Sequence, residues 1–306
     1  MAARSIPKVS LIGSGKVGSS LARALFEKGY PIVSIINRTG PPAIRLAGAV
    51  KCKRVSTHID NIHASTDIII IAVTDDSLQN VADELSKTKR LSLKNILVAH
   101  TSGAHASSVL SALRRKGALT ASMHPIQSFP EGRKQAKLRG IFFGVEGAPE
   151  ALIQVERLVQ DVGARMVTIP PELKPLYHIA CVFASSYMVA LLNAIGEMAA
   201  LLNIRASWTE VFGPLMTAAT ENTIKTSAWN ALTGPIIRRD STTISLHLKT
   251  LAAIAPQFLP LYCVAGIEVA RVATEHGKMT KAEYQDIVSL FRQFLKSYPD
   301  SKKSKP

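Results

Sequence analysis

A glycine pattern near the N-terminus constrains the fold more than any other feature of this chain. Gly13, Gly15 and Gly18 form GxGxxG between an apolar run at residues 8–12 and the helical pattern LARALFEKG. The first glycine permits a tight turn, the second lets the backbone approach a pyrophosphate, and the third lets the helix pack on the strand. The helix N-terminus then faces the phosphates. The motif predicts a dinucleotide site formed by Gly13, Ser14, Gly15, Lys16, Val17 and Gly18.

Apolar strand patterns and helical patterns alternate through the first half of the chain. This alternation predicts an α/β fold, with a doubly wound, Rossmann-like and mostly parallel sheet. Further strands are expected at residues 31–37, 66–73, 95–103, 118–125, 140–147 and 165–169, and further helices at 43–49, 77–85, 106–117 and 149–163.

The texture of the sequence changes after the Pro-Pro pair at 170–171. Strand patterns stop there, and helical patterns dominate at 176–202, 257–276 and 281–296. We therefore expect a nucleotide-binding domain at residues 1–170 and an all-helical C-terminal domain at 171–296 that serves substrate binding and dimerisation. Residues 297–306 form a basic tail that we expect to be disordered.

Composition argues against several other classes of protein. The net charge is +15 over 306 residues, but the basic residues are dispersed and no nucleic-acid-binding signature accompanies them. A generally basic surface, which would attract anionic ligands, is therefore favoured over a nucleic-acid site. Cys52, Cys181 and Cys263 form no CxxC pair, so we expect no metal site and a reducing, cytoplasmic setting. No apolar stretch of about 20 residues lacks charged or turn residues, and we expect no membrane helix.

The end of the second expected strand bears on the choice of dinucleotide. Asn37, Arg38 and Thr39 stand where an NAD site usually carries an acidic residue. Without a carboxylate, a 2′-phosphate is not repelled, and Arg38 can pair with it, so NADP is favoured; a solvated surface arginine is the alternative. Val73 and Thr74 end the third strand and could line the nicotinamide ribose, and Asp76 is expected to cap the next helix.

Three further polar clusters are candidates for a reaction site. Ser102 and Gly103 end the fourth strand in HTSGA, where Ser102 either donates to a substrate carboxylate or shapes the loop. His124, in MHPIQSF, is interpreted as structural. In the segment 230–248, Arg239 beside Asp240 either binds a carboxylate or belongs to a solvated helix connection.

A lysine and a histidine four residues apart open the helical region. If both are helical, Lys174 and His178 lie near one face. A lysine amine can protonate or stabilise a developing alkoxide, and a nearby histidine can position the proton. Spacing alone favours a simpler interpretation, in which a surface lysine lies beside a core histidine.

Several of these segments together carry a family resemblance. GSGKVGSSLA, HTSGA, HPIQSF, YHIACVFASS and ALTGPIIRRDSTT occur in this order between residue 7 and about residue 290. The set resembles Rossmann-like NADP-dependent oxidoreductases whose helical C-terminal domain was once of unknown function, with a subgroup resembling an alternative type of ketopantoate reductase. It is also similar to the wider group of 6-phosphogluconate and 3-hydroxyisobutyrate dehydrogenases.

The resemblance implies roles for particular residues. Lys174 matches the catalytic lysine of the wider group, and His178 stands where that group usually has asparagine. Ser102 and Gly103 match the loop with which the wider group binds the substrate carboxylate. Arg239 with Asp240 would assist in binding the substrate. Two positions depart from the expected pattern and bear on the substrate: Ser186 stands in place of asparagine, and Arg239 in place of glycine.

The resemblance also implies an activity. We expect an NADPH-dependent reductase of a small carboxylate-bearing carbonyl compound, with ketopantoate as the leading substrate, acting as a homodimer formed through the helical domain. Alternatives are reduction of an imine, as in proline synthesis, a deazaflavin-linked reductase, or a non-enzymatic NADP-binding sensor.

Overall fold

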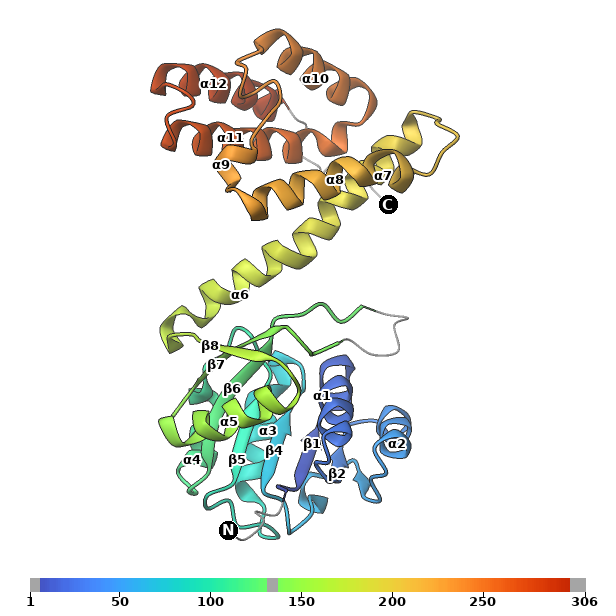
Figure 1. Cartoon of the computed structure of the whole chain (residues 1–306), viewed down its shortest axis with the longest axis vertical. Helices are drawn as coiled ribbons and strands as arrows, with labels where there is room; N and C mark the ends of the chain where they lie inside the picture. Colours follow the sequence, from blue (N-terminus) through green and yellow to red (C-terminus); the bar gives the residue numbers. More distant parts are fainter. Residues whose placement is uncertain (1–5, 131–136, 298–306) are drawn as a thin grey trace. The chain divides into compact units, whose positions relative to one another are not determined.

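The computed structural model describes residues 6–130 and 137–297, and its contacts divide the chain into two compact units, Met1–Tyr187 and Met188–Pro306. The first unit holds the sheet and the second is helical (Figure 1).

The first unit is built on one eight-stranded sheet with the strand order β3-β2-β1-β4-β5-β6-β7-β8. Neighbouring strands are parallel except β6 and β7, which are antiparallel. The order reverses between β1 and β4, and ligands of such sheets bind at the carboxyl ends of the strands beside this point. The strands are β1 (Val9–Ile12), β2 (Ile32–Ile36), β3 (Val55–Ser56), β4 (Ile68–Ile71), β5 (Leu97–His100), β6 (Leu119–Pro125), β7 (Phe142–Gly147) and β8 (Arg165–Thr168).

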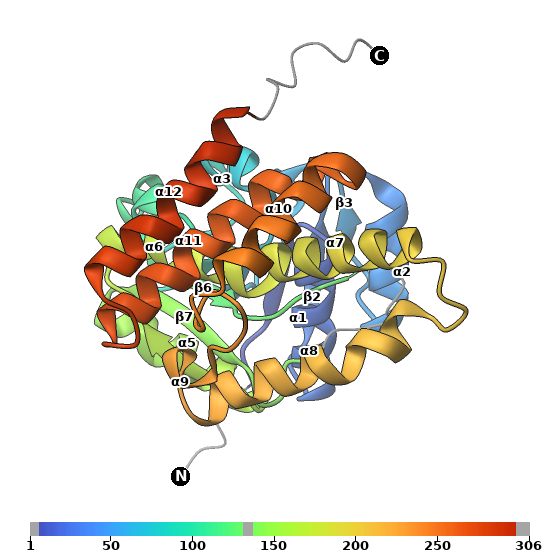
Figure 2. The same cartoon turned by 90° about the horizontal axis from the view of Figure 1, so that it is seen from above.

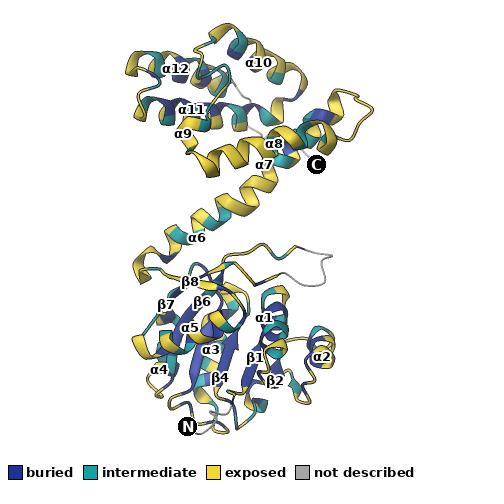
Figure 3. Cartoon of the chain, viewed as in Figure 1, coloured by how far each residue is buried: buried dark blue, intermediate teal, exposed yellow. Residues whose placement is uncertain are grey.

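Helices cover both faces of this sheet, as the doubly wound pattern predicts. The central strand β4 shows why: its four isoleucines alternate between two separate cores, with Ile68 and Ile70 in one and Ile69 and Ile71 in the other. Helices α1 (Lys16–Glu27), α2 (Gly40–Ala49) and α5 (Pro149–Asp161) contribute to the first core, and α3 (Asp75–Lys87) and α4 (Ser111–Arg114) to the second. In Figure 3 the central strands are deeply buried, and β1, β4 and β5 are buried along their whole length.

The region after the sheet contains only helices among its described residues, which confirms the second half of the predicted fold class. A helical run begins at the short turn η3 (Pro171–Leu173) and continues through α6 (Lys174–Val182), the π-helical turn η4 (Phe183–Tyr187) and α7 (Met188–Leu201). The boundary between the two contact units lies within this run, because α6 packs on the sheet. The predicted tail at 297–306 lies outside the described residues, apart from Ser297.

The second unit has a core of its own. Besides α7, it contains α8 (Trp208–Lys225), α9 (Ala228–Ala231), α10 (Ser241–Ile254), a short turn η5 (Pro256–Phe258), α11 (Leu259–Glu275) and α12 (Lys281–Ser297). Ile244, Leu248, Cys263 and Phe291 are buried together between α10, α11 and α12, which lie side by side in Figure 2. Gly266 leaves room for the Phe291 ring, since a Cβ there would come within 2.5 Å of it.

The helical run combines an apolar composition with high exposure. Residues Pro171–Leu201 are long and apolar enough to cross a membrane, with a mean hydropathy of 1.8 in the most apolar window, and only 6% of that window is buried. A helix that packs in a subunit interface would have the same properties. The expectation that the chain has no membrane helix therefore stays a prediction.

Candidate functional site

The glycine loop after β1 adopts the geometry that its motif predicts. Gly13 has a φ of 97°, and a Cβ there would collide with the Ala72 carbonyl oxygen. A Cβ at Gly18 would collide with the carbonyl oxygen of Gly13, whereas a Cβ at Gly15 would meet no atom of the described residues within 4 Å. Two glycines are thus required by packing, and the third leaves open space at the N-terminus of α1. This is the position at which a dinucleotide pyrophosphate needs close access to the backbone.

Ser14 carries the most informative polar atom of this loop. Its side chain is buried, with 5% exposure, and its hydroxyl has no hydrogen-bond partner among the described residues. Its backbone N–H donates to Asn37 Oδ1 at 2.9 Å, and its carbonyl accepts from Ser19 Oγ at 2.9 Å. Buried hydroxyls in proteins normally have partners, so an unpartnered one beside a helix N-terminus fits a bound phosphate.

Of the residues after β2, Asn37 supports the glycine loop and Arg38 is available to bind the cofactor. Asn37 Nδ2 donates to the Thr39 carbonyl at 2.7 Å while its Oδ1 binds Ser14, so this side chain ties the end of β2 to the glycine loop. Arg38 is exposed and has no ion-pair partner within the described parts of the chain. Its guanidinium is therefore available to a 2′-phosphate.

The residues after β4 border the same loop. Val73 lies against Gly13, where a Cβ would come within 3.1 Å of Val73 Cγ1. Thr74 is the N-cap of α3, and its hydroxyl lies 3.1 Å from Ser77 Oγ. The expectation that Asp76 caps this helix is wrong: Asp75 and Asp76 lie in its first turn, where a negative charge interacts favourably with the helix dipole.

Lys174 is the most deeply buried charged group described in the chain. It opens α6 with no exposed surface, and its Nζ donates to Ser122 Oγ at 2.6 Å and to the Ser102 carbonyl at 3.3 Å. Burial lowers the pKa of this amine from 10.5 to about 8, although the carboxylate of Glu146 opposes the shift. The surface lysine that spacing alone had favoured is therefore not what the structure contains.

The Ser102 loop is held by the groups around it. Ser102 N–H donates to His100 Nδ1 at 3.2 Å, and Ser102 Oγ accepts from the backbone N–H of His105 at 3.1 Å. His100 Nε2 lies 3.3 Å from the Ala106 carbonyl, and burial lowers the pKa of His100 to about 4, so the ring is neutral. The loop is thus shaped by internal hydrogen bonds, and no described residue accepts the hydroxyl proton of Ser102, which is available to a ligand.

A cluster of rings lies next to this loop. A Cβ on Gly103 would come within 2.6 Å of His178 Cδ2 and 3.1 Å of His124 Nε2. The His124 and His178 rings are 5.8 Å apart in an edge arrangement. His124 Nδ1 lies 2.7 Å from the hydroxyl of Tyr177. Ser102, Gly103, Lys174 and His178, all predicted from the sequence, therefore meet at one place, at the carboxyl ends of β5 and β6.

Three residues at this site were missed or misread from the sequence. Tyr177 was overlooked, although it lies three residues after Lys174 and so on the same side of a helix. Glu146 gave no signal, because its partner Ser107 is remote in sequence; the Ser107 N–H and hydroxyl donate to its carboxylate at 2.5 and 2.8 Å. His124 was interpreted as structural, yet it is among the side chains that face Gly103.

The remaining predicted residues, Arg239 and Asp240, lie in the second unit and make structural contacts. Asp240 caps α10, accepting hydrogen bonds from the Thr243 N–H at 2.9 Å and its hydroxyl at 2.6 Å. Arg239 forms an ion pair with Glu283 at 2.7 Å and donates to the Lys278 carbonyl at 2.8 Å. Their role in substrate binding stays a prediction.

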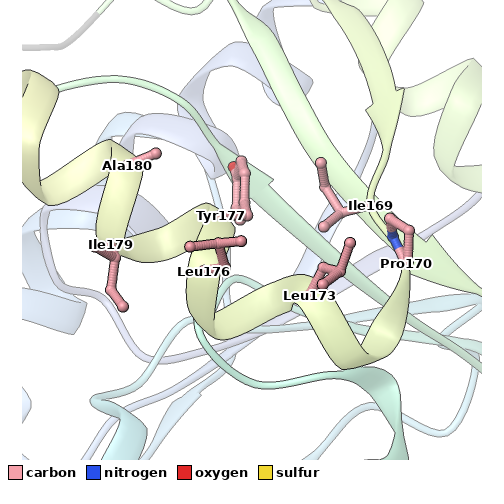
Figure 4. Close-up of a pocket in the computed structure, with 7 residues that line it drawn as sticks. All are labelled: Ile169, Pro170, Leu173, Leu176, Tyr177, Ile179 and Ala180. Carbon is pink, nitrogen blue, oxygen red and sulfur yellow. The ribbon is translucent and has the colours of Figure 1, made fainter. Parts of the chain in front are cut away.

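An apolar hollow borders the sheet-facing part of α6. Figure 4 shows the side chains that line it, and Tyr177 is among them, so its ring contributes to the hollow while its hydroxyl binds His124. The lining residues are Ile169, Pro170, Leu173, Leu176, Tyr177, Ile179 and Ala180.

Comparisons with sequence families match both parts of the chain. Residues 3–125 match the Rossmann-like domain, and residues 141–268 match the domain of unknown function DUF2520. The chain combines a Rossmann-like domain with a DUF2520 domain. The DUF2520 match begins within the sheet, at β7, and so includes the last strands as well as α6. The two matches confirm the Rossmann-like domain and the C-terminal domain of once unknown function that the family resemblance implies. A search of curated protein sequences finds no match.

Solved structures share the same fold over most of their length. Protein BF3122 from Bacteroides fragilis is 24% identical, with a TM-score of 0.72 over 86% of this chain and 98% of its own. An imine reductase from Myxococcus stipitatus in complex with NADP+ is 18% identical, with a TM-score of 0.56 over 95% of both chains. A pyrroline-5-carboxylate reductase from Coxiella burnetii is 13% identical, with a TM-score of 0.55 over 96% of this chain and 99% of its own.

Proposed function

We propose that this chain is an NADP(H)-dependent oxidoreductase. The observation that carries the proposal is the glycine loop, where the described part of the chain leaves the buried Ser14 hydroxyl without a partner and the space over Gly15 open. Arg38, with no acidic residue beside it, supports NADP over NAD. The imine reductase that shares the fold carries NADP+, which agrees with this choice.

The group reduced is proposed to be a carbonyl or imine carbon of a small anionic compound. NADPH, when bound, supplies the hydride; the chain supplies placement and charge. Ketopantoate remains the leading carbonyl substrate, on the resemblance described above. The imine reductase and the pyrroline-5-carboxylate reductase favour a cyclic imine as the second candidate.

Lys174 has a defined part in this proposal. Its amine is fully buried, with hydrogen bonds to the Ser102 carbonyl and the Ser122 hydroxyl. In this position the amine orients both groups and places a positive charge beneath the reaction site. Direct protonation of a substrate by Lys174 would require the covered amine to become accessible to it. Ser102 and Gly103 are proposed to bind the substrate carboxylate, and half-buried His178 to contact the substrate beside them.

A turnover assay tests the proposal. NADPH oxidation is followed spectrophotometrically with a panel of 2-keto acids and cyclic imines, with a deazaflavin analogue as a separate arm. The proposal expects at least one panel member to be reduced, and reduction to be slower in Lys174→Met. If NADPH binds but nothing in the panel or the deazaflavin arm is reduced, the chain is a cofactor-binding sensor and the oxidoreductase assignment is wrong.

We also propose that two copies of the chain associate through their helical parts. The support is two groups of exposed apolar side chains: Leu173, Leu176, Phe183 and Tyr187 along the helical run, and, separately, Val211 and Leu215, four residues apart on α8. Exposure of this kind in a helical segment is typical of a surface that becomes buried on association. A cytoplasmic location and the lack of nucleic-acid binding stay predictions.

A further inference from the structure

We propose that His124 is a catalytic residue that donates a hydrogen bond from Nε2–H to the substrate carbonyl, and that Tyr177 is the residue that positions it. The inference rests on the proposed reductase function, but its structural half can be tested without a substrate. It gives a role to a histidine that sequence reasoning had treated as structural.

Two glycines make this arrangement possible. Gly144 on β7 is the register partner of His124 on β6, and a Cβ there would collide with the Tyr177 hydroxyl. Because Gly144 has no side chain, Tyr177 can reach from α6 across β7 to His124. Gly103 does the same on the other side, since a Cβ there would lie 3.1 Å from His124 Nε2 and Cε1. A side chain at either position would displace the pair.

The contacts of the His124 ring define which nitrogen carries the proton. Burial raises the pKa of the Tyr177 hydroxyl, so the phenol keeps its proton and can donate to Nδ1 at 2.7 Å. Burial first, and then the positive charge of Lys174, lowers the pKa of His124 to about 4, so the ring is neutral near pH 7. A neutral ring that accepts at Nδ1 carries its single proton on Nε2.

That N–H is free to bind a ligand. His124 Nε2 has no hydrogen-bond partner among residues 6–130 and 137–297, and it lies beside Gly103 at the carboxyl ends of β5 and β6. An N–H held in place before the reaction stabilises the negative charge that grows on a carbonyl oxygen as hydride reaches its carbon. His124 keeps its proton throughout, so its contribution is a hydrogen bond and not a proton transfer.

The first test needs only the full-length protein with NADP+ bound. Long-range ¹H–¹⁵N correlation spectra of the histidine rings, assigned by the loss of one set of signals in His124→Gln, report which nitrogen is protonated. We expect Nε2–H in the wild type and a mixture of tautomers in Tyr177→Phe. A wild-type ring protonated on Nδ1, or one that Tyr177→Phe leaves unchanged, would overturn the inference.

The second test uses any substrate that the NADPH assay yields. His124→Leu should lower kcat by about 100-fold or more, the effect of removing one fixed donor to an oxyanion. His124→Gln keeps an N–H near the Nε2 position and should recover at least a tenth of the wild-type kcat. Tyr177→Phe should lower kcat by about tenfold without changing the NADPH Kd.

The helical unit offers a matched control. Tyr262 places its hydroxyl 2.8 Å from His247 Nδ1, the same pairing in a different part of the chain. Tyr262→Phe should leave kcat unchanged. A His124→Leu enzyme within twofold of the wild type would contradict a catalytic role for His124. A wild type that does not bind NADPH would instead contradict the proposed function. Failure of the His124 role and failure of the proposed function are therefore distinguishable.

Discussion

Lys174 illustrates how burial of a single residue couples stability to function. Its amine has no exposed surface, and its two described hydrogen bonds go to uncharged groups, Ser122 and Ser102. Holding a charged amine there opposes folding, and proteins usually keep such a group only where it has a task. The most economical task here is to hold the Ser102 loop and to keep nearby histidine rings neutral.

This burial gives a pH-dependent prediction. The pKa of Lys174 falls from 10.5 in the unfolded chain to about 8 in the folded one, so below pH 8 its charge costs roughly 3 kcal/mol. Between pH 8 and 10.5 the unfolded state binds more protons, so stability rises with pH. The free energy of unfolding of the wild type, relative to Lys174→Met, should therefore increase by up to about 3 kcal/mol over this window.

Urea unfolding of both proteins at a series of pH values measures this difference. Lys225, whose amine forms an exposed ion pair with Glu221, provides the control, and Lys225→Met should show no such increase. A difference between wild type and Lys174→Met that stays flat from pH 8 to 10.5 would mean that the amine is not held charged in a buried site.

At the scale of elements, local patterns predicted the fold well. The four isoleucines of β4 and the helical periodicity of α5 each reflect contacts that depend on nearby residues, so strands and helices could be placed from the sequence. The short edge strand β3 and the π-helical turn at 183–187 were not predicted. Both depend on pairing or packing with remote segments, which leave no periodic signal.

The site was predictable to a lesser degree, for the same reason. Ser102 and Gly103 could be selected because they follow a strand, where parallel sheets place their ligands. Lys174 and His178 could be selected from their four-residue spacing and from the family resemblance. The positioning of His124 by Tyr177 depends on the antiparallel pairing of β6 with β7 and on the absence of a side chain at Gly144. No local pattern records that combination.

The glycine loop makes a prediction that separates folding from binding. Gly15→Ala should fold with nearly the wild-type melting temperature, because its Cβ meets none of the described residues within 4 Å, but it should weaken NADPH binding by obstructing the pyrophosphate. Gly18→Ala should destabilise the protein, because its Cβ would collide with the Gly13 carbonyl oxygen. Thermal unfolding and a fluorescence titration with NADPH check both. Equal effects of the two substitutions on stability would contradict this division of roles.

For the whole molecule, the exposed apolar helical surface predicts association. Full-length protein should sediment at twice the chain mass of 33.0 kDa. The double variant Val211→Asp, Leu215→Asp should shift it toward the monomer, since charges would then have to be buried in the interface, whereas Thr220→Asp serves as the control on the same helix. A monomeric wild type, or one that instead partitions onto phospholipid vesicles, would contradict a homodimer formed through these helices.

The central claim is that the glycine loop binds NADP(H), and its most direct test is the affinity for the two dinucleotides. NADPH and NADH are titrated against the wild type and Arg38→Ala, with binding followed by fluorescence. We predict that the wild type binds NADPH at least tenfold more tightly than NADH. Arg38→Ala should lose most of that preference while retaining its NADH affinity, because only the 2′-phosphate contact is removed. Equal or tighter binding of NADH by the wild type would contradict the account.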